Sequence, residues 1–168
     1  MLITAIAAMA HPSRIIGDGL DIPFRHPEDM KFFRRTTVGG QLIVGRRTFL
    51  TLAPSFLASA GRRLIVMTRG NREGLPEHLP HVTYVRNAGA ALEEARREPH
   101  MPVFVIGGAE VYKVMLPHCS RVLLTCVEKA ELTVGDTYMP EFESEFLEVG
   151  SFALADNWRT RVYTRCAS

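Results

Sequence analysis

The chain has 168 residues, of which 46% are hydrophobic and 23% are charged. This length supports one well-buried core but not two ordinary domains, so we expect a single domain over residues 1–168. The net charge of +2 is spread along the chain without a basic run or interleaved aromatic residues, which argues against binding to nucleic acid.

Residues 1–10 are apolar, but no basic segment precedes them and they are too short to cross a bilayer. We therefore interpret them as a buried strand and expect no membrane partner. The three cysteines, Cys119, Cys126 and Cys166, lack the spacing of a disulfide framework or a zinc site, which favours a reducing cytoplasm. Histidines and carboxylates also lack the spacing of metal ligands, so we expect no bound metal.

Apolar runs mark the expected strands. Five runs rich in Val, Ile and Leu are nearly continuous rather than alternating, which is typical of strands covered on both faces. In chain order they are residues 2–9, 41–44, 64–68, 103–106 and 122–127. Residues 82–85 predict a further strand.

Helix-like segments separate these strands, at residues 27–36, 46–52, 88–97 and 109–116. The alternation predicts a parallel or mainly parallel sheet with helices on both faces. Residues 146–152 and 158–165 flank a turn and predict an antiparallel hairpin at the sheet edge. In the second of these segments, one face is expected to carry Trp158, Thr160, Val162 and Thr164.

Three of the expected strands end in turns suited to phosphate binding: residues 45–48, 68–70 and 107–110. In an open α/β sheet, ligands bind beyond the carboxyl ends of the strands, where helix N-termini offer free N–H groups. The glycines allow close backbone approach and the arginines offer forked donors. Neither G-x-G-x-x-G nor a P-loop is present. We therefore predict a phosphorylated dinucleotide site with a different binding mode.

Asp29 is the candidate catalytic acid. Pro27 suits the first position of a helix, and helical spacing from Asp29 reaches Phe32 and Phe33, so the carboxylate is expected to face an apolar surface. The residues alone leave two interpretations open, a first-turn acid favoured by the helix dipole or a buried acid retained for chemistry. No G-x-S-x-G elbow and no evident Cys–His pair offers another catalytic centre.

The chain resembles dihydrofolate reductases of the bacterial chromosomal type. The shared motifs run along nearly its whole length: Ile6-Ala7-Ala8, Ile16-Gly17, Ile22-Pro23-Phe24, Asp29-Met30 with Phe33, Gly45-Arg46-Arg47-Thr48, Gly61-Arg62, Ile106-Gly107-Gly108, Val111-Tyr112, Leu124-Thr125 and Gly135-Asp136-Thr137. The resemblance implies a single-domain α/β fold, with a twisted, mainly parallel eight-stranded sheet, an antiparallel C-terminal strand and about four flanking helices. It also implies NADPH-dependent reduction of 7,8-dihydrofolate to 5,6,7,8-tetrahydrofolate, in one-carbon metabolism, by a cytoplasmic monomer.

The resemblance assigns roles to single residues. Asp29, with Phe24 and Thr125, would form the catalytic group, gripping the pterin and assisting protonation of N5 while hydride reaches C6. The substrate would contact Ile6, Ala7, Ala8, Met30, Phe33, Leu52, Leu57, Arg62 and Ile106, with Arg62 binding the glutamate tail. NADPH would be lined by Ala8, Ile16, Gly17, Asp18, Leu20, Gly45, Arg46, Arg47, Thr48, Thr68, Arg69, Gly107, Gly108, Ala109, Glu110, Val111, Tyr112 and Thr137. Residues 18–22 resemble the mobile lid of the family.

Three positions depart from the family pattern. Phe24 stands where Trp is usual, so an indole N–H that helps to hold an active-site water is missing. Ala109 and Glu110 stand where a third glycine and a basic residue are common. Two alternatives are therefore kept: another reductase of the same fold, such as the pyrimidine reductase of riboflavin synthesis, and a catalytically silent nucleotide-binding module.

Overall fold

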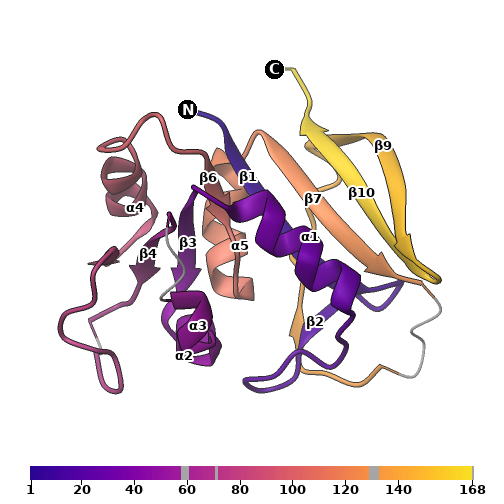
Figure 1. Ribbon diagram of the computed structural model, residues 1–168. Coiled ribbons are helices and arrows are strands. Elements are labelled where there is room, and N and C mark those ends of the chain that lie inside the picture. Colours follow the sequence, from indigo (N-terminus) through magenta and orange to yellow (C-terminus); the bar gives the residue numbers. More distant parts are fainter. Residues whose placement is uncertain (58–60, 71, 129–132, 168) are drawn as a thin grey trace.

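An eight-stranded sheet forms the centre of the computed structural model, which describes residues 1–57, 61–70, 72–128 and 133–167 (Figure 1). Across the sheet the strands run in the order β5-β4-β3-β6-β1-β7-β10-β9. Their bounds are β1 Ile3–Ala10, β3 Gln41–Gly45, β4 Arg63–Met67, β5 Val82–Val85, β6 Val103–Val105, β7 Arg121–Val127, β9 Phe146–Ala155 and β10 Trp158–Arg165.

Every neighbouring pair of strands is parallel except the two pairs that involve β10, which runs antiparallel to both β7 and β9. The predicted mainly parallel sheet, and the hairpin at its edge, are therefore confirmed. A second, two-stranded sheet pairs β2 (Ile15–Gly17) with β8 (Thr137–Tyr138) and was not predicted.

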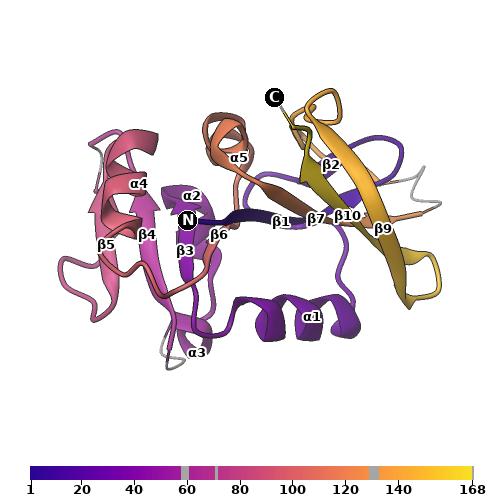
Figure 2. The same cartoon turned by 90° about the horizontal axis from the view of Figure 1, so that it is seen from above.

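The described helices are α1 Pro27–Thr37, α2 Arg46–Thr51, α3 Pro54–Leu57, α4 Ala88–Ala95 and α5 Ala109–Met115, and a 3₁₀ turn spans Leu116–His118. The four predicted helices are confirmed with small shifts at their ends, whereas the single turn of α3 was missed. Helix α1 covers one face of the sheet, and α4 and α5 cover the other (Figure 2). His26 caps α1, because its Nδ1 accepts a hydrogen bond of 3.1 Å from the N–H of Glu28.

The sheet separates two hydrophobic clusters. On the α1 side, the front cluster is built around Ile6, Leu42, Val44, Phe49, Leu64, Val66, Phe104 and Ile106. On the α4 and α5 side, the rear cluster includes Ile43, Ile65, Val105, Val111, Tyr112, Met115 and Leu124. Alternate residues of one strand enter different clusters, as the twofold periodicity of a strand requires. Both faces of the central strands are therefore buried, which explains their continuous apolar sequences.

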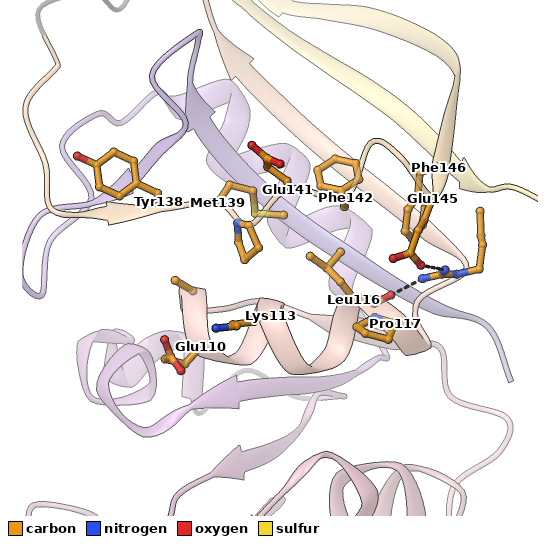
Figure 3. Close-up of a pocket in the computed structure, with 13 residues that line it drawn as sticks. Glu110, Lys113, Leu116, Pro117, Tyr138, Met139, Glu141, Phe142, Glu145 and Phe146 are labelled. Carbon is orange, nitrogen blue, oxygen red and sulfur yellow. Dashed lines mark hydrogen bonds and ion pairs between the residues drawn. The ribbon is translucent and has the colours of Figure 1, made fainter.

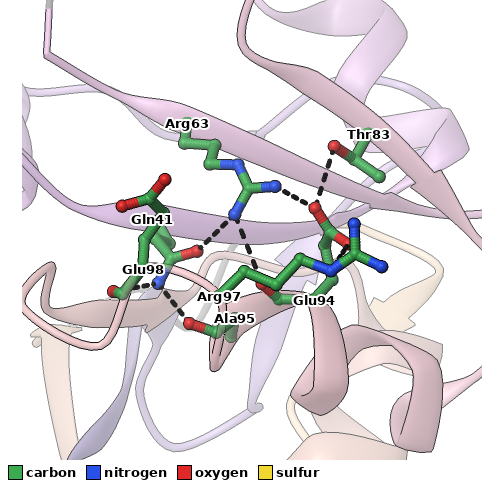
Figure 4. A network of polar contacts seen from close by, with 7 residues as sticks. All are labelled: Gln41, Arg63, Thr83, Glu94, Ala95, Arg97 and Glu98. Atoms are coloured by element: carbon green, nitrogen blue, oxygen red, sulfur yellow. Dashed lines mark hydrogen bonds and ion pairs between the residues drawn. The ribbon is translucent and has the colours of Figure 1, made fainter.

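A buried polar network joins α4 to β3, β4 and β5 at the amino ends of these strands (Figure 4). The Glu94 carboxylate bonds to the Arg63 guanidinium and accepts from the Thr83 hydroxyl at 3.3 Å. Arg63 also donates to the Gln41 side chain at 3.1 Å, and Gln41 donates to the Ala95 carbonyl at 2.7 Å. This network stabilises the end of the sheet that lies away from the glycine turns.

Candidate active site

Two of the predicted turns, those after β3 and β6, are joined by a backbone hydrogen bond. The Gly45 N–H donates to the Gly107 carbonyl at 2.7 Å. A Cβ atom on Gly45 would lie 3.0 Å from a methyl group of Val111, and one on Gly107 would lie 2.9 Å from the Tyr112 ring. Gly107 also has a φ of 102°, which favours glycine. Gly45 and Gly108 precede α2 and α5, so the N-termini of these two helices lie side by side at the joined turns.

Cationic side chains surround these turns. Arg46, at the start of α2, donates from Nη2 to the Glu73 carbonyl at 2.7 Å. Its Nε is buried and has no hydrogen-bond partner among the described residues. Arg47 and Arg69 are exposed, and Thr68, which precedes Arg69 at the end of β4, is buried. The cluster offers several donors to an anion beyond the strand ends, although Glu110, exposed in the first turn of α5, adds a negative charge.

Asp29 lies in the first turn of α1 and is partly buried. Burial raises the pKa of its carboxyl, while a hydrogen bond from Thr125 on β7 and the charge of His26 oppose that rise. The pKa is nevertheless raised overall. An acid stabilised only by the helix dipole would show the opposite shift, so Asp29 is a partly buried acid, and its catalytic role stays a prediction.

Two residues of β10 that the sequence did not single out as site residues, Thr160 and Trp158, contact the neighbours of Asp29. The Thr160 hydroxyl on β10 lies 3.0 Å from that of Thr125. The Trp158 ring packs against His26 with ring centres 5.2 Å apart, and against Phe24 at 5.9 Å in an edge-on arrangement. The predicted alternation in residues 158–165 does put Trp158 and Thr160 on one face. The pairing of β10 with β7 then puts Thr160 opposite Thr125, the hydrogen-bond partner of Asp29, which no local pattern shows.

An apolar wall continues from Asp29 along α1. Phe33 stacks on Phe56 with ring centres 5.7 Å apart, and both pack against the front cluster together with Leu52 and Leu57. Met30 is 39% exposed and lies on the open side of the helix. Ile6 and Ile106 are buried in the same cluster, whereas the side chains of Ala7 and Ile16 pack against the rear cluster. Ala7 can therefore face the front side only with its backbone.

Arg62 lies at the other end of α1. Its Nη2 donates to the Arg34 carbonyl at 2.7 Å, its Nε donates to the Thr37 hydroxyl at 3.3 Å, and its guanidinium lies over the Phe56 ring at 4.7 Å. Burial, helped by the charge of Arg34, lowers the pKa of Arg62. An acidic group and a basic group thus mark the two ends of one apolar surface.

The predicted lid is tethered to residues 135–138. Asp18 and Asp21 exchange two backbone hydrogen bonds of 2.9 Å, which closes a tight loop. The Gly19 N–H donates to the Asp136 carboxylate at 3.0 Å, and the Thr137 hydroxyl donates to the same oxygen at 2.8 Å. These bonds lower the pKa of Asp136. Leu20 is exposed, and Gly17 pairs with Thr137 between β2 and β8.

A cavity of about 500 Å³ lies elsewhere, between α5 and residues 138–146 on the rear side (Figure 3). Lys113, Met139, Glu141 and Phe142 are among the side chains that line it. Of the predicted site residues, only Ala109 and Glu110 reach its wall. This cavity is therefore separate from the surface around Asp29.

The sequence profile of the family described as dihydrofolate reductase matches residues 2–164. The chain belongs to the dihydrofolate reductase family. Among its relatives, dihydrofolate reductase HdrB of Haloferax volcanii is 35% identical over 139 residues, which cover 82% of this chain and 70% of the relative. The type 3 dihydrofolate reductase of Salmonella typhimurium is 34% identical over 144 residues, covering 86% and 82%.

The dihydrofolate reductase of Enterococcus faecalis, solved in complex with NADP(H) and RAB-propyl, shares the fold. The two structures compare with a TM-score of 0.78 and 24% sequence identity, over 99% of this chain and 97% of the Enterococcus faecalis chain. Membership of the dihydrofolate reductase family disfavours the alternative of a riboflavin-pathway reductase. No helix within the described residues is long and apolar enough to cross a membrane.

Proposed function

We propose that this protein is an NADPH-dependent dihydrofolate reductase that reduces C6 of 7,8-dihydrofolate and uses Asp29 to support protonation of N5. The observation that carries the proposal is the partly buried Asp29 carboxylate, hydrogen-bonded by Thr125 and placed on the front face of the sheet. Family membership and the names of the relatives support the same activity.

The two ends of α1 fit the two ends of the substrate. A carboxylate at Asp29 matches the N3–H and 2-amino group of a pterin with two parallel hydrogen bonds. Arg62 contacts the last turn of α1, eight residues beyond Asp29, which corresponds to about 12 Å along a helix. Between them, Phe33, Leu52 and Leu57 offer an apolar wall for the aromatic linker. Arg62 would then bind the carboxylates of the glutamate tail.

The raised pKa of Asp29 is the property that the reaction needs. A carboxyl that holds its proton to a higher pH than an exposed aspartate can supply a proton toward N5, directly or through water. Phe24 packs on Trp158 and supplies no hydrogen-bond donor, so Asp29 would carry this task without an indole N–H beside it. Residues 18–22 would act as a lid that excludes water.

The joined turns fit NADPH, which supplies the hydride when bound. The starts of α2 and α5 lie side by side at these turns, and their backbone N–H groups would bind a pyrophosphate. The buried Nε of Arg46 is a donor without a partner among the described residues, and Arg69 lies beyond the neighbouring strand. These two arginines, with Arg47 and Thr68, are the candidates for the 2′-phosphate.

The test is to mix the purified protein with NADPH and dihydrofolate and to follow the absorbance of the reduced nicotinamide. Asp29→Asn should slow hydride transfer by about 10²-fold or more at neutral pH while NADPH binding stays nearly unchanged. Glu28→Gln is the matched control, because Glu28 neighbours Asp29 on α1 but pairs with Lys31 at 2.7 Å. Absence of dihydrofolate-dependent oxidation by the wild-type protein would refute the proposal.

A further inference from the structure

A chain of buried oxygens leads from Asp29 into the sheet. Thr125 of β7 and Thr160 of β10 are directly paired across the antiparallel strands, and their hydroxyl oxygens lie 3.0 Å apart. The exposed fractions of the two residues are 1% and 0%. Because Thr125 also hydrogen-bonds Asp29, the three side chains form one line from α1 through β7 to β10.

The number of available protons determines which hydroxyl group donates and which accepts in this series of hydrogen bonds. A threonine hydroxyl has one proton to donate, and an ionised carboxylate can only accept. When Thr125 donates to ionised Asp29, its proton is used, so the 3.0 Å contact requires that Thr160 donate to Thr125. Hydrogen bonds aligned in one direction polarise and strengthen one another in a buried site.

We propose that Thr160 is a positioning residue for the reductase, whose hydroxyl holds Thr125 as a donor to Asp29 and thereby favours the ionised carboxylate. The effect of Thr160 on hydride transfer rests on the proposed function, whereas its effect on the Asp29 carboxylate does not. Within the described part of the chain, the other titratable groups that interact electrostatically with Asp29 are His26, before α1, and Tyr112, on α5. Neither residue takes part in the hydrogen bonds that connect Thr160, Thr125 and Asp29.

Packing alone does not account for a threonine at this position. Valine has the same branched shape and fills buried positions of the paired strand, such as Val122. A hydroxyl placed in a buried site destabilises the fold unless it has a hydrogen-bond partner. For Thr160 the hydrogen-bond partner that the structure gives is the Thr125 hydroxyl, which is also bonded to Asp29.

The experiment is a carbon-13 NMR titration of the Asp29 side-chain carboxyl in the ligand-free protein, assigned by the signal lost in Asp29→Asn. Thr160→Val should raise the pKa of Asp29 by about half a unit to one unit, as expected for loss of one modest hydrogen bond. Thr160→Ser, which keeps the hydroxyl, should retain the wild-type value. Thr164→Val on the same strand, as a control for removing a hydroxyl from β10, should also retain it.

An unchanged or lowered pKa in Thr160→Val would overturn the proposal, since a lowered value means that Thr125 had been donating to Thr160. An equal rise in Thr164→Val would also overturn it. If Thr160→Val does not fold, Thr160→Ala replaces it and is compared with Thr160→Ser. Equal pKa values of Asp29 in those two variants would then overturn the proposal as well.

The pH profile of hydride transfer should shift in the same direction as the titration. Because the titration uses no substrate, an inactive wild-type protein would refute the reductase assignment while leaving the role of Thr160 to be decided by the NMR result.

Discussion

Replacing Glu94 with glutamine is expected to destabilise the fold without changing the candidate site. Glu94 and Arg63 have side chains that are 8% and 19% exposed, so their ion pair is largely shielded from water. Removing one partner of a buried pair costs about 3–5 kcal/mol. Because water reaches part of Arg63 and most of Arg97, which is 74% exposed, we expect about 2–3 kcal/mol here.

For a chain of this size, that loss corresponds to a fall in melting temperature of about 4–12 °C, measured by circular dichroism. Glu93→Gln is the matched control, because Glu93 is the exposed neighbour on α4 and its replacement should change stability by less than about 0.5 kcal/mol. Turnover below the melting temperature should be unchanged, since the network lies at the opposite strand ends from the turns. Equal melting temperatures for the two variants would refute the reasoning.

Three more predictions concern the candidate site and the thiols. Asp29→Asn should be more stable than wild type at about pH 8, because burial raises the pKa of Asp29 and the wild-type folded state then holds an unfavourable charge. This difference in stability should disappear as the pH falls toward 3.8, the ordinary pKa of an aspartate, and thermal melts at several pH values measure it. Arg69→Gln should weaken NADPH binding by about 10-fold and NADH binding far less, by fluorescence titration, and equal weakening would exclude a 2′-phosphate contact. Cys166 is exposed and should be the one thiol that reacts rapidly with a disulfide reagent, because burial raises the pKa of Cys119 to about 12 and of Cys126 to about 11; a fast phase that survives Cys166→Ser would contradict this.

Strong local patterns made most of the sheet predictable. Strands such as β3 and β7 are apolar runs bounded by turn residues, and their sequences define them without help from the rest of the chain. The strands β2 and β8 have three and two residues, and they exist because residues about 120 positions apart meet. A pattern that short has no periodicity to detect. The single turn of α3 was missed for the same reason.

In the candidate site too, some residues could be identified from their neighbours in the sequence, whereas others depend on contacts between distant segments. Asp29 and the turn at Gly45 are visible in the sequence because each has neighbours with a clear physical preference. The second partner of Thr125 is not visible, because Thr160 reaches it only through the register of β10 on β7. The position of Trp158 against His26 depends on that register as well. Knowledge of the strand pairing would have been enough to identify both.

Because the sheet divides the core into two clusters, substitutions at adjacent residues of one strand should have different effects. Leu42 and Val44 belong to the front cluster that supports Phe33 and Leu52, whereas Ile43, between them, belongs to the rear cluster. Truncating Val44 would therefore disturb both folding and the wall proposed for the substrate, while truncating Ile43 would disturb folding alone. Substitutions along β3 should accordingly change turnover at every second position, on the face toward α1, and change stability alone at the positions between them.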